Sequence, residues 1–403
     1  MRGLSYRPDI DGLRAIAVLF VFLFHLNHAF LPGGFTGVDI FFVISGYLIT
    51  TIIVRGLQDG SFSLVQFYQR RILRIIPAYY LVTSATFLFG YLALMPIEFD
   101  ALSMSVRASI FFVSNFWFAR RVDYFDQSSD QEYLLHYWSL AIEEQYYLII
   151  PLALMGWWMV TGKRTPAIFL AVLFFVSFTA SVILSQTSPL NAYFMLHTRA
   201  WELMAGGLLA VWAANRAVGR MTANALGVAG VFLCAASGFM LSENVVFPGY
   251  LALLPTLGAV FLLASGLNAA SVVSRLLAHP VLVGVGLISY PLYLWHWPVI
   301  TAARTIGVAS EKLVPATLIF VLSMALSYAT WRWVELPIRR WRTAPPRRAF
   351  AMLGSLSAVF LGATILVEAT DGLPQRLPAE LIATLDGKHS WKGSPQLTCM
   401  GAW

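Results

Sequence analysis

The sequence predicts an all-α integral membrane protein, a polytopic bundle of about eleven transmembrane helices. Of its 403 residues, 58% are hydrophobic and only 12% are charged, whereas a soluble domain carries about 25% charged residues. The apolar residues form runs of about 20 that do not alternate with polar residues, and this pattern is typical of membrane-spanning helices. Together these observations argue against a soluble globular protein.

The apolar runs define the expected spans in chain order. They cover residues 11–30, 36–54, 77–96, 139–160, 166–186, 198–214, 222–241, 249–267, 281–302, 313–334 and 347–369. The stretch 101–118 is also apolar, but it contains Arg107 and Asn115. We therefore expect a re-entrant or interfacial segment there rather than a further span.

The basic residues predict the orientation of the bundle. With a cytoplasmic N-terminus, the inner loops hold most of the arginine and lysine residues, and the outer loops hold chiefly Arg107, Arg120, Arg121, Arg304 and Lys312. This distribution favours an N-terminus inside the cell. It also accounts for the net charge of +7, and no basic stripe interleaved with aromatic residues predicts a nucleic-acid partner.

Three regions are expected along the chain. Residues 1–342 would form a ten-helix transmembrane core. Residues 343–371 would form a basic hinge and an additional transmembrane helix, because the basic segment RRWRTAPPRR precedes the last apolar run. Residues 372–403 would form a polar linker outside the cytoplasm.

Neither a cleavable signal peptide nor a metal site is predicted. The first apolar run contains His25 and His28 and has no small-residue cleavage site, so we expect it to remain as the first span. The two cysteines, Cys234 and Cys399, have no spacing typical of a metal site or a disulfide framework.

The first span carries two polar side chains that are costly in lipid. Arg14 and His25 are eleven residues apart. At 100° per residue this separation is three turns plus about 20°, so both side chains lie on one helix face, about 16 Å apart along the axis. That face is expected to contact protein or water rather than lipid.

Several spans bring ionisable residues to the outer edge of the predicted bundle. The short turn after the first span would place Asp39 at the depth of His25, where a carboxylate can fix an imidazole tautomer and raise its basicity. Other segments would bring further ionisable side chains to the same level, namely His136, Glu143, Arg199, Glu202 and His296. The pattern predicts an outer polar pocket.

The opposite edge carries a basic cluster. Three arginines precede the third predicted span, namely Arg70, Arg71 and Arg74. Arg74 is four residues from Arg70 and three from Arg71, so it shares a helix face with either of them. Paired guanidinium groups suit a ligand rich in phosphate. The sequence therefore predicts a basic mouth on the cytoplasmic side.

Each of these features also has a structural interpretation. The arginines of the basic mouth could serve topology alone, and Asp39 could interact with the helix dipole. His25 could be a hydrogen-bonded core residue, and Glu143, Arg199 and Glu202 could form structural ion pairs. The joint pattern favours function over these alternatives.

The motifs resemble the membrane-bound acyltransferase family 3. They are RPDIDGLRAIAVLFVFLFH, GVDIFFVISGYLI, QFYQRRILRIIP, HYWSLAIEEQYYL and ISYPLYLWHWPV, in that order from residue 7 to residue 299. The additional span and outward tail are similar to those of O-antigen and related polysaccharide O-acetylases, in which an SGNH-type domain follows. That domain is expected to be missing or truncated here.

The resemblance implies an acyl-CoA donor, usually acetyl-CoA, and a carbohydrate acceptor outside the cytoplasm, such as lipopolysaccharide O-antigen. It implies that His25 is the catalytic histidine and that Arg14 is its essential partner. It also implies that the protein lies in the cytoplasmic (inner) membrane of a bacterium. We expect Asp39 or Glu143 to orient His25, which would act either as a base or as the acyl acceptor.

The remaining candidates are assigned to the two substrates. Arg70, Arg71 and Arg74 would hold the phosphates of acetyl-CoA, with Arg14, Ser289 and Tyr290 contributing to the donor site. The acceptor would contact four outer residues, His136, Arg199, Glu202 and His296. Alternatives are a transporter or exporter of a glycan or lipid-linked sugar, and a binding or sensor protein in which His25 is a pH switch.

Overall fold

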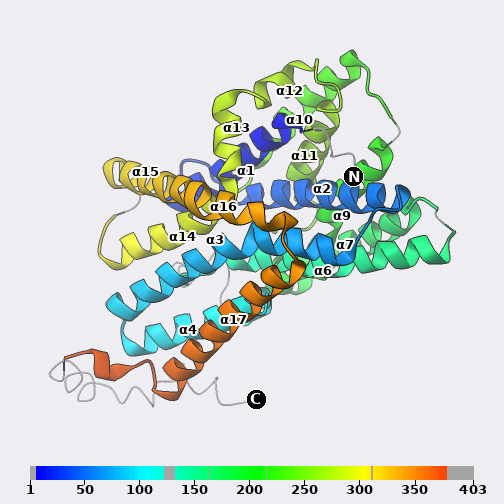
Figure 1. Ribbon diagram of the computed structural model, residues 1–403. Coiled ribbons are helices and arrows are strands. Elements are labelled where there is room, and N and C mark those ends of the chain that lie inside the picture. Colours follow the sequence, from blue (N-terminus) through cyan, green and yellow to red (C-terminus); the bar gives the residue numbers. More distant parts are fainter. Residues whose placement is uncertain (1–5, 122–131, 163, 215, 310–311, 379–403) are drawn as a thin grey trace.

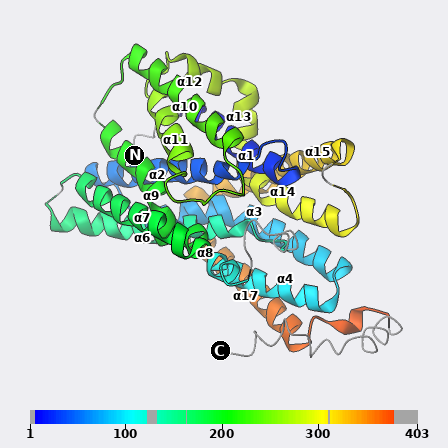
Figure 2. The same ribbon diagram turned by 180° about the vertical axis from the view of Figure 1, so that it is seen from behind.

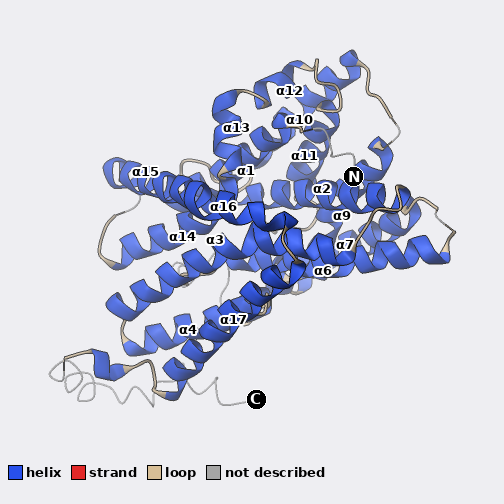
Figure 3. Cartoon of the chain, in the orientation of Figure 1, coloured by secondary structure: helices blue, strands red, loops and turns tan. Residues whose placement is uncertain are grey.

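The computed structural model describes residues 6–121, 132–162, 164–214, 216–309 and 312–378, and every element in these ranges is a helix (Figure 3). The longer helices are α1 (Pro8–Leu26), α2 (Gly37–Gln58), α3 (Leu64–Ala93), α4 (Pro96–Ile110), α6 (Tyr137–Val160), α7 (Ala167–Thr187), α9 (Leu196–Ala213), α10 (Arg220–Met240), α11 (Leu253–Ser265), α13 (Pro280–Leu287), α14 (Ser289–Thr305), α15 (Leu313–Thr330) and α17 (Pro346–Ala369). The short elements are η1 (Gly34–Thr36), α5 (Ser114–Phe118), α8 (Pro189–Phe194), α12 (Val272–Leu277), η3 (Trp331–Glu335), α16 (Leu336–Arg339), η4 (Arg340–Thr343) and η5 (Pro374–Arg376).

Six helical stretches in the described part of the chain are long and apolar enough to cross a membrane. They are Gly34–Gln58, Leu64–Ala93, Ala167–Thr187, Arg220–Met240, Leu313–Thr343 and Pro346–Ala369. The prediction of a helical, multi-pass membrane protein is confirmed, whereas the count of eleven spans stays a prediction.

The predicted spans coincide with helices, with two differences in detail. The helix α3 begins at Leu64 rather than near residue 77. The predicted span 281–302 is divided between α13 and α14, which meet at Ile288. The apolar stretch 101–118 contains the end of α4 and all of α5, and α4 packs against α3 and α17.

The helices form layers around α1, α2 and α3. Figures 1 and 2 show α10, α11, α12 and α13 gathered on one side of these helices, and α4 and α17 on the opposite side. Helix α1 packs against α2, α13 and α14, and most of its residues are buried. Both polar residues singled out in the first span therefore lie inside the bundle.

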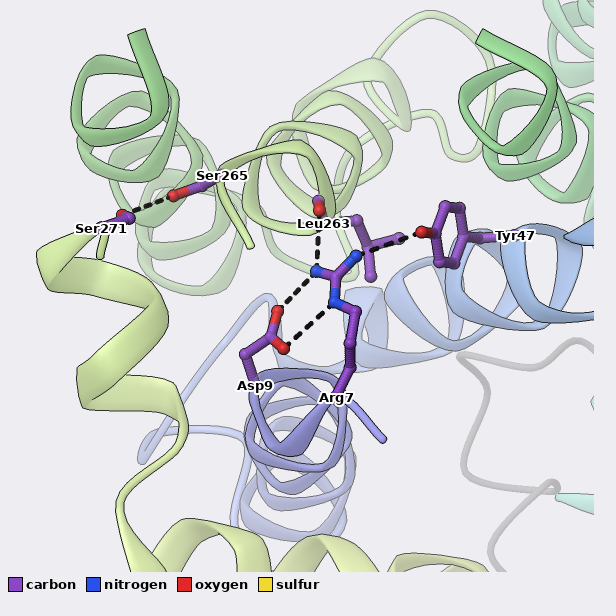
Figure 4. A network of polar contacts seen from close by, with 6 residues as sticks. All are labelled: Arg7, Asp9, Tyr47, Leu263, Ser265 and Ser271. Atoms are coloured by element: carbon purple, nitrogen blue, oxygen red, sulfur yellow. Dashed lines mark hydrogen bonds and ion pairs between the residues drawn. The ribbon is translucent and has the colours of Figure 1, made fainter. Parts of the chain in front are cut away.

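The start of α1 is fixed by the side chain of Arg7 (Figure 4). Its guanidinium donates to both oxygens of Asp9, to the hydroxyl of Tyr47 in α2 at 3.1 Å and to the carbonyl of Leu263 in α11 at 2.9 Å. These bonds hold α1 to two other helices, which sets the position of every residue farther along α1.

Helices α2 and α9 approach each other closely because two glycines face each other across the contact. A Cβ atom on Gly46 would lie 1.8 Å from the carbonyl oxygen of Leu203, and one on Gly206 would lie 2.0 Å from that of Val43. Only residues without a side chain permit this approach. Asp39 is seven residues from Gly46 and therefore lies on the face of α2 that contacts α9.

Candidate functional site

A cavity inside the bundle brings together many of the residues that the sequence singled out. Side chains from α1, α2, α3, α6 and α14 line it. Six of the predicted residues are among them, namely Arg14, Arg71, Arg74, Glu143, Ser289 and Tyr290. We call this space the central cavity.

Three guanidinium groups and two carboxylates line the central cavity. Arg14 pairs with Asp11 at 3.4 Å, and Arg74 forms no hydrogen bond or ion pair with the described residues. Glu143 accepts hydrogen bonds from Ser45 at 2.9 Å and from Tyr147 at 2.8 Å. The second carboxylate is that of Glu144. The cavity thus has more cationic than anionic groups, which favours an anionic ligand.

The depths of these residues differ from those expected. Arg71 and Arg74 were predicted at the cytoplasmic mouth and Glu143 at the outer edge, yet all three line one cavity. The reason is that α3 begins at Leu64, so the two arginines lie two to three turns inside it. Arg70 is exposed and does not line this cavity.

Two buried polar atoms at the central cavity lack partners in the described part of the chain. They are the Oγ of Ser289, a fully buried residue, and the Nε of Arg71. The neighbouring Tyr290 donates its hydroxyl to the carbonyl of Ile75 at 3.0 Å. Buried polar groups are normally hydrogen-bonded, so unpaired ones beside a cavity favour a site for a polar ligand.

The buried His25 contacts a second histidine. Its Nδ1 lies 3.0 Å from Nε2 of His296 in α14, and the two rings stack with centroids 5.2 Å apart. His296 in turn lies 2.6 Å, through Nδ1, from the carbonyl oxygen of Tyr293. The carbonyl oxygen of His25 accepts a hydrogen bond from Arg304 at 3.0 Å.

A third histidine completes this group. The Nε2 of His136 lies 3.1 Å from the carbonyl oxygen of Leu294, and its ring centroid is 5.6 Å from that of His296. The carbonyl of Leu294 is available because Pro298, four residues later in α14, has no N–H to donate to it. We call His25, His136 and His296 the histidine cluster.

Helix α14 connects the central cavity to the histidine cluster. Ser289, Tyr293 and His296 are spaced to lie on one face of α14. Tyr293 lines the cavity, and its ring centroid is 5.3 Å from that of His296. The cavity therefore reaches to within one helical turn of the histidine cluster. His25 itself is 4% exposed and does not line the cavity.

Asp39 does not orient His25 as expected. Neither carboxylate oxygen of Asp39 makes a hydrogen bond to the described residues, and its nearest ionic partner is Arg199, at 3.4 Å. The close approach of α2 to α9 turns Asp39 toward α9. Glu143 does not fill the role either, because its carboxylate binds Ser45 and Tyr147.

Arg199 and Glu202 are likewise separate from the histidine cluster. Arg199 pairs with Glu202 at 2.9 Å as well as with Asp39, and all three side chains are at most 1% exposed. Four aromatic rings surround the guanidinium with centroids 5.5 to 5.8 Å away, those of Phe42, Trp138, Tyr193 and Phe247. None of the three ionic residues lines the central cavity.

The sequence interpretation missed Tyr293, which links the cavity to the histidine cluster. Its spacing from Ser289 and His296 was the signal that could have found it. A second cavity of about 450 Å³, lined almost entirely by apolar side chains, lies among α3, α14 and α15. Trp295 and Val299 of α14 line this second cavity, on the side of the helix away from the central one.

Comparison with known proteins decides the family. A family model described as an acyltransferase domain, that of acyltransferase family 3, matches residues 7–332. The chain belongs to this family. The matched range contains all the residues that line the central cavity, the three residues of the histidine cluster, and Arg199 with its partners Asp39 and Glu202.

The acyltransferase is also similar to several curated bacterial proteins. It is 34% identical to the peptidoglycan O-acetyltransferase OatA of Listeria monocytogenes over 83% of this chain and 56% of that protein. It is 32% identical to the O-acetyltransferase OatA of Staphylococcus aureus over 90% of this chain and 61% of that protein. The chain thus spans about three fifths of the length of these relatives. No solved structure matches it.

Proposed function

We propose that this acyltransferase moves an acetyl group from acetyl-CoA to a hydroxyl of a carbohydrate on the other side of the membrane. The observation that carries the proposal is the geometry of α14. A cavity rich in guanidinium groups ends one helical turn from a buried pair of histidines. The cavity that would hold an anionic donor therefore lies one helical turn from a proton-accepting group.

The donor would enter the central cavity from the cytoplasmic side. The guanidinium groups of Arg71 and Arg74 would bind its phosphates, because guanidinium groups form strong, charge-assisted bonds to phosphate. Arg14 and Ser289, which lie on the helices that carry the histidines, would contact the pantetheine arm or the thioester. Arg70, which is exposed outside the cavity, is not part of this proposal.

His25 would carry the transfer step. In one route it removes the proton from the acceptor hydroxyl while that oxygen attacks the thioester carbonyl carbon. The C–O bond forms, the C–S bond breaks, and His25 returns the proton to the departing CoA thiolate. In the other route Nε2 of His25 attacks the thioester carbonyl carbon, the C–S bond breaks and CoA leaves as the thiolate. The acceptor hydroxyl then attacks the acetyl carbon on His25, the C–O bond forms, the C–N bond breaks, and the hydroxyl proton passes to the CoA thiolate. Trapping an acetylated His25 after a single turnover would identify the second route.

The acceptor is proposed to be a bacterial surface carbohydrate. Relatives are named for O-acetylation of peptidoglycan, and lipopolysaccharide O-antigen is the acceptor first expected from the sequence. Both offer sugar hydroxyls outside the cytoplasm. The protein would lie in the inner membrane with its N-terminus in the cytoplasm, so that the donor and acceptor reach the bundle from opposite sides.

The test supplies purified protein in detergent or liposomes with radiolabelled acetyl-CoA. Peptidoglycan fragments and O-antigen lipopolysaccharide are offered in separate reactions. We expect label in one of the two carbohydrates and release of an equal amount of free CoA. The His25→Ala variant should lose transfer by a factor of about 10² or more, because general acid–base catalysis contributes that much.

His279→Gln is the matched control, because this histidine is exposed and does not line the central cavity. It should transfer label at the rate of the unmodified protein. Full transfer by His25→Ala would overturn the proposal. Carbohydrate flux into vesicles without consumption of acetyl-CoA would support the exporter alternative instead.

A further inference from the structure

We propose that His296 is a positioning residue that fixes the tautomer of His25. In this arrangement Nδ1 of His25 carries the hydrogen and Nε2 carries the lone pair that accepts a proton or an acetyl group. The proposal rests on the proposed function of His25. It assigns to His296 a role different from the acceptor contact expected from the sequence.

The argument begins at the backbone of α14. The Nδ1 of His296 lies 2.6 Å from the carbonyl oxygen of Tyr293. A carbonyl oxygen only accepts hydrogen bonds, so Nδ1 of His296 must carry the hydrogen. A neutral imidazole has one N–H, so Nε2 of His296 is left as an acceptor.

The same rule then determines the tautomer of His25. Its Nδ1 lies 3.0 Å from Nε2 of His296, which is a hydrogen-bond distance. Because Nε2 of His296 is the acceptor, Nδ1 of His25 is the donor. The lone pair of His25 is therefore on Nε2, the nitrogen farther from the helix backbone. A carboxylate fills the corresponding role in a serine protease triad, where it holds the histidine in its working tautomer.

The surroundings favour neutral rings at both positions. His25 is 4% exposed and His296 is fully buried. The ring centroid of Trp297 is 4.6 Å from that of His25, and the ring centroid of Phe22 is 5.6 Å from that of His296. Two charged imidazoles in contact would repel each other, and charging either one in an apolar environment is costly. The hydrogen-bond chain from Tyr293 to His25 therefore persists in its neutral form.

The tautomer of His136 is also set by a backbone carbonyl of α14. Its Nε2 donates to the carbonyl of Leu294, so its lone pair is on Nδ1. That nitrogen is buried and has no hydrogen-bond partner among the described residues. The consecutive carbonyls of Tyr293 and Leu294 thus set the tautomers of two histidines, and through His296 that of a third.

Three variants separate hydrogen bonding from packing. His296→Phe keeps an aromatic ring but cannot accept a hydrogen bond from His25. His296→Gln keeps an acceptor oxygen near the position of Nε2. His279→Gln is the exposed control for the same substitution. All three are assayed by acetyl transfer, and folding is checked by size-exclusion chromatography and thermal unfolding.

We expect His296→Phe to lower kcat by about 10²- to 10⁴-fold, the range spanned by acid–base catalysis and by loss of a histidine's working tautomer. The KM for acetyl-CoA should stay within about twofold, because His296 does not line the central cavity. The kcat of His296→Gln should be at least tenfold higher than that of His296→Phe. A folded His296→Phe with kcat within threefold of the unmodified protein would overturn the proposal. An equal loss in folded Gln and Phe variants would also overturn it.

A spectroscopic readout tests the tautomer without relying on transfer. Nitrogen-15 NMR of histidine-labelled protein distinguishes protonated from unprotonated ring nitrogens, and His25→Ala assigns the His25 signals. For His25 in the native protein, we expect an unprotonated Nε2 and a protonated Nδ1. In His296→Phe, where the hydrogen bond to His25 is lost, we expect a mixture of the two tautomers of His25, and in His296→Gln a smaller share of the second tautomer. A protonated Nε2 in the native protein contradicts the proposal. If the tautomer is as expected but acetyl transfer never occurs, the proposed function fails instead.

Discussion

At the scale of single residues, arginine serves two different purposes in this protein. Arg199 is buried between two carboxylates and four aromatic rings, so its charge is satisfied within the protein. Arg74 lines a cavity and has no hydrogen bond or ion pair to the described residues. The first arrangement holds helices together, and the second leaves a guanidinium group available for a ligand.

The arginines that line the central cavity lead to a prediction about the affinity for acetyl-CoA. Arg71→Gln and Arg74→Gln should each raise the KM for acetyl-CoA about tenfold or more, because a hydrogen bond to a charged group is worth about 1.5–3 kcal/mol. The value of kcat should change little, since binding is lost equally in the ground and transition states. Steady-state kinetics with acetyl-CoA measure both values.

The matched control for this prediction is Arg55→Gln, at an exposed arginine in the last turn of α2. A second control is the donor S-acetylpantetheine, which lacks the nucleotide and its phosphates. The unmodified protein should bind this donor poorly, and the cavity variants should add no further penalty. An equal effect of the variants on both donors would show that the arginines do not bind the nucleotide part.

At the scale of helices, small residues and proline decide which faces meet. Gly46 and Gly206 let α2 and α9 approach closely, and this contact carries Asp39 to Arg199 rather than to His25. Pro298 frees a carbonyl of α14 that holds His136. The polar clusters are therefore consequences of how the helix backbones pack.

This packing predicts the effect of a single methyl group. Gly46→Ala should lower the apparent melting temperature of the detergent-solubilised protein, because the new Cβ would overlap the carbonyl oxygen of Leu203. Overpacking of this kind costs about 1–3 kcal/mol. Gly156→Ala in α6 is the control, since a Cβ there would have no atom within 4 Å. Equal melting temperatures for the two variants would show that the α2–α9 contact is not tight.

At the scale of the whole molecule, the proposed function requires that two sides of the membrane be kept apart. The central cavity and the histidine cluster lie one after the other along α14. The two loops that flank α2 lie at opposite ends of that helix. The excess of basic residues in alternate loops predicts which of these ends faces the cytoplasm.

Cysteine labelling tests this orientation. Ala29, between α1 and α2, and Asp59, directly after α2, are both exposed. In a chain whose own cysteines are replaced by alanine, Ala29→Cys should react with a membrane-impermeant maleimide on intact cells. Asp59→Cys should react only after the membrane is permeabilised. The reverse pattern would place the N-terminus outside and would exclude cytoplasmic entry of the donor as described.

The sequence by itself determined the helical membrane class, the approximate positions of the helices and the motifs that carry the family. These properties depend on apolar runs and on spacing within one helix, which are local. It also identified six of the residues that line the central cavity. Which residues meet was decided only by the tertiary structure. The rotation of each helix about its axis and its offset along its neighbours depend on close contacts such as those of Gly46 and Gly206. For this reason His25 meets His296 instead of Asp39, and Arg71 meets Glu143 inside one cavity instead of lying at the opposite edge.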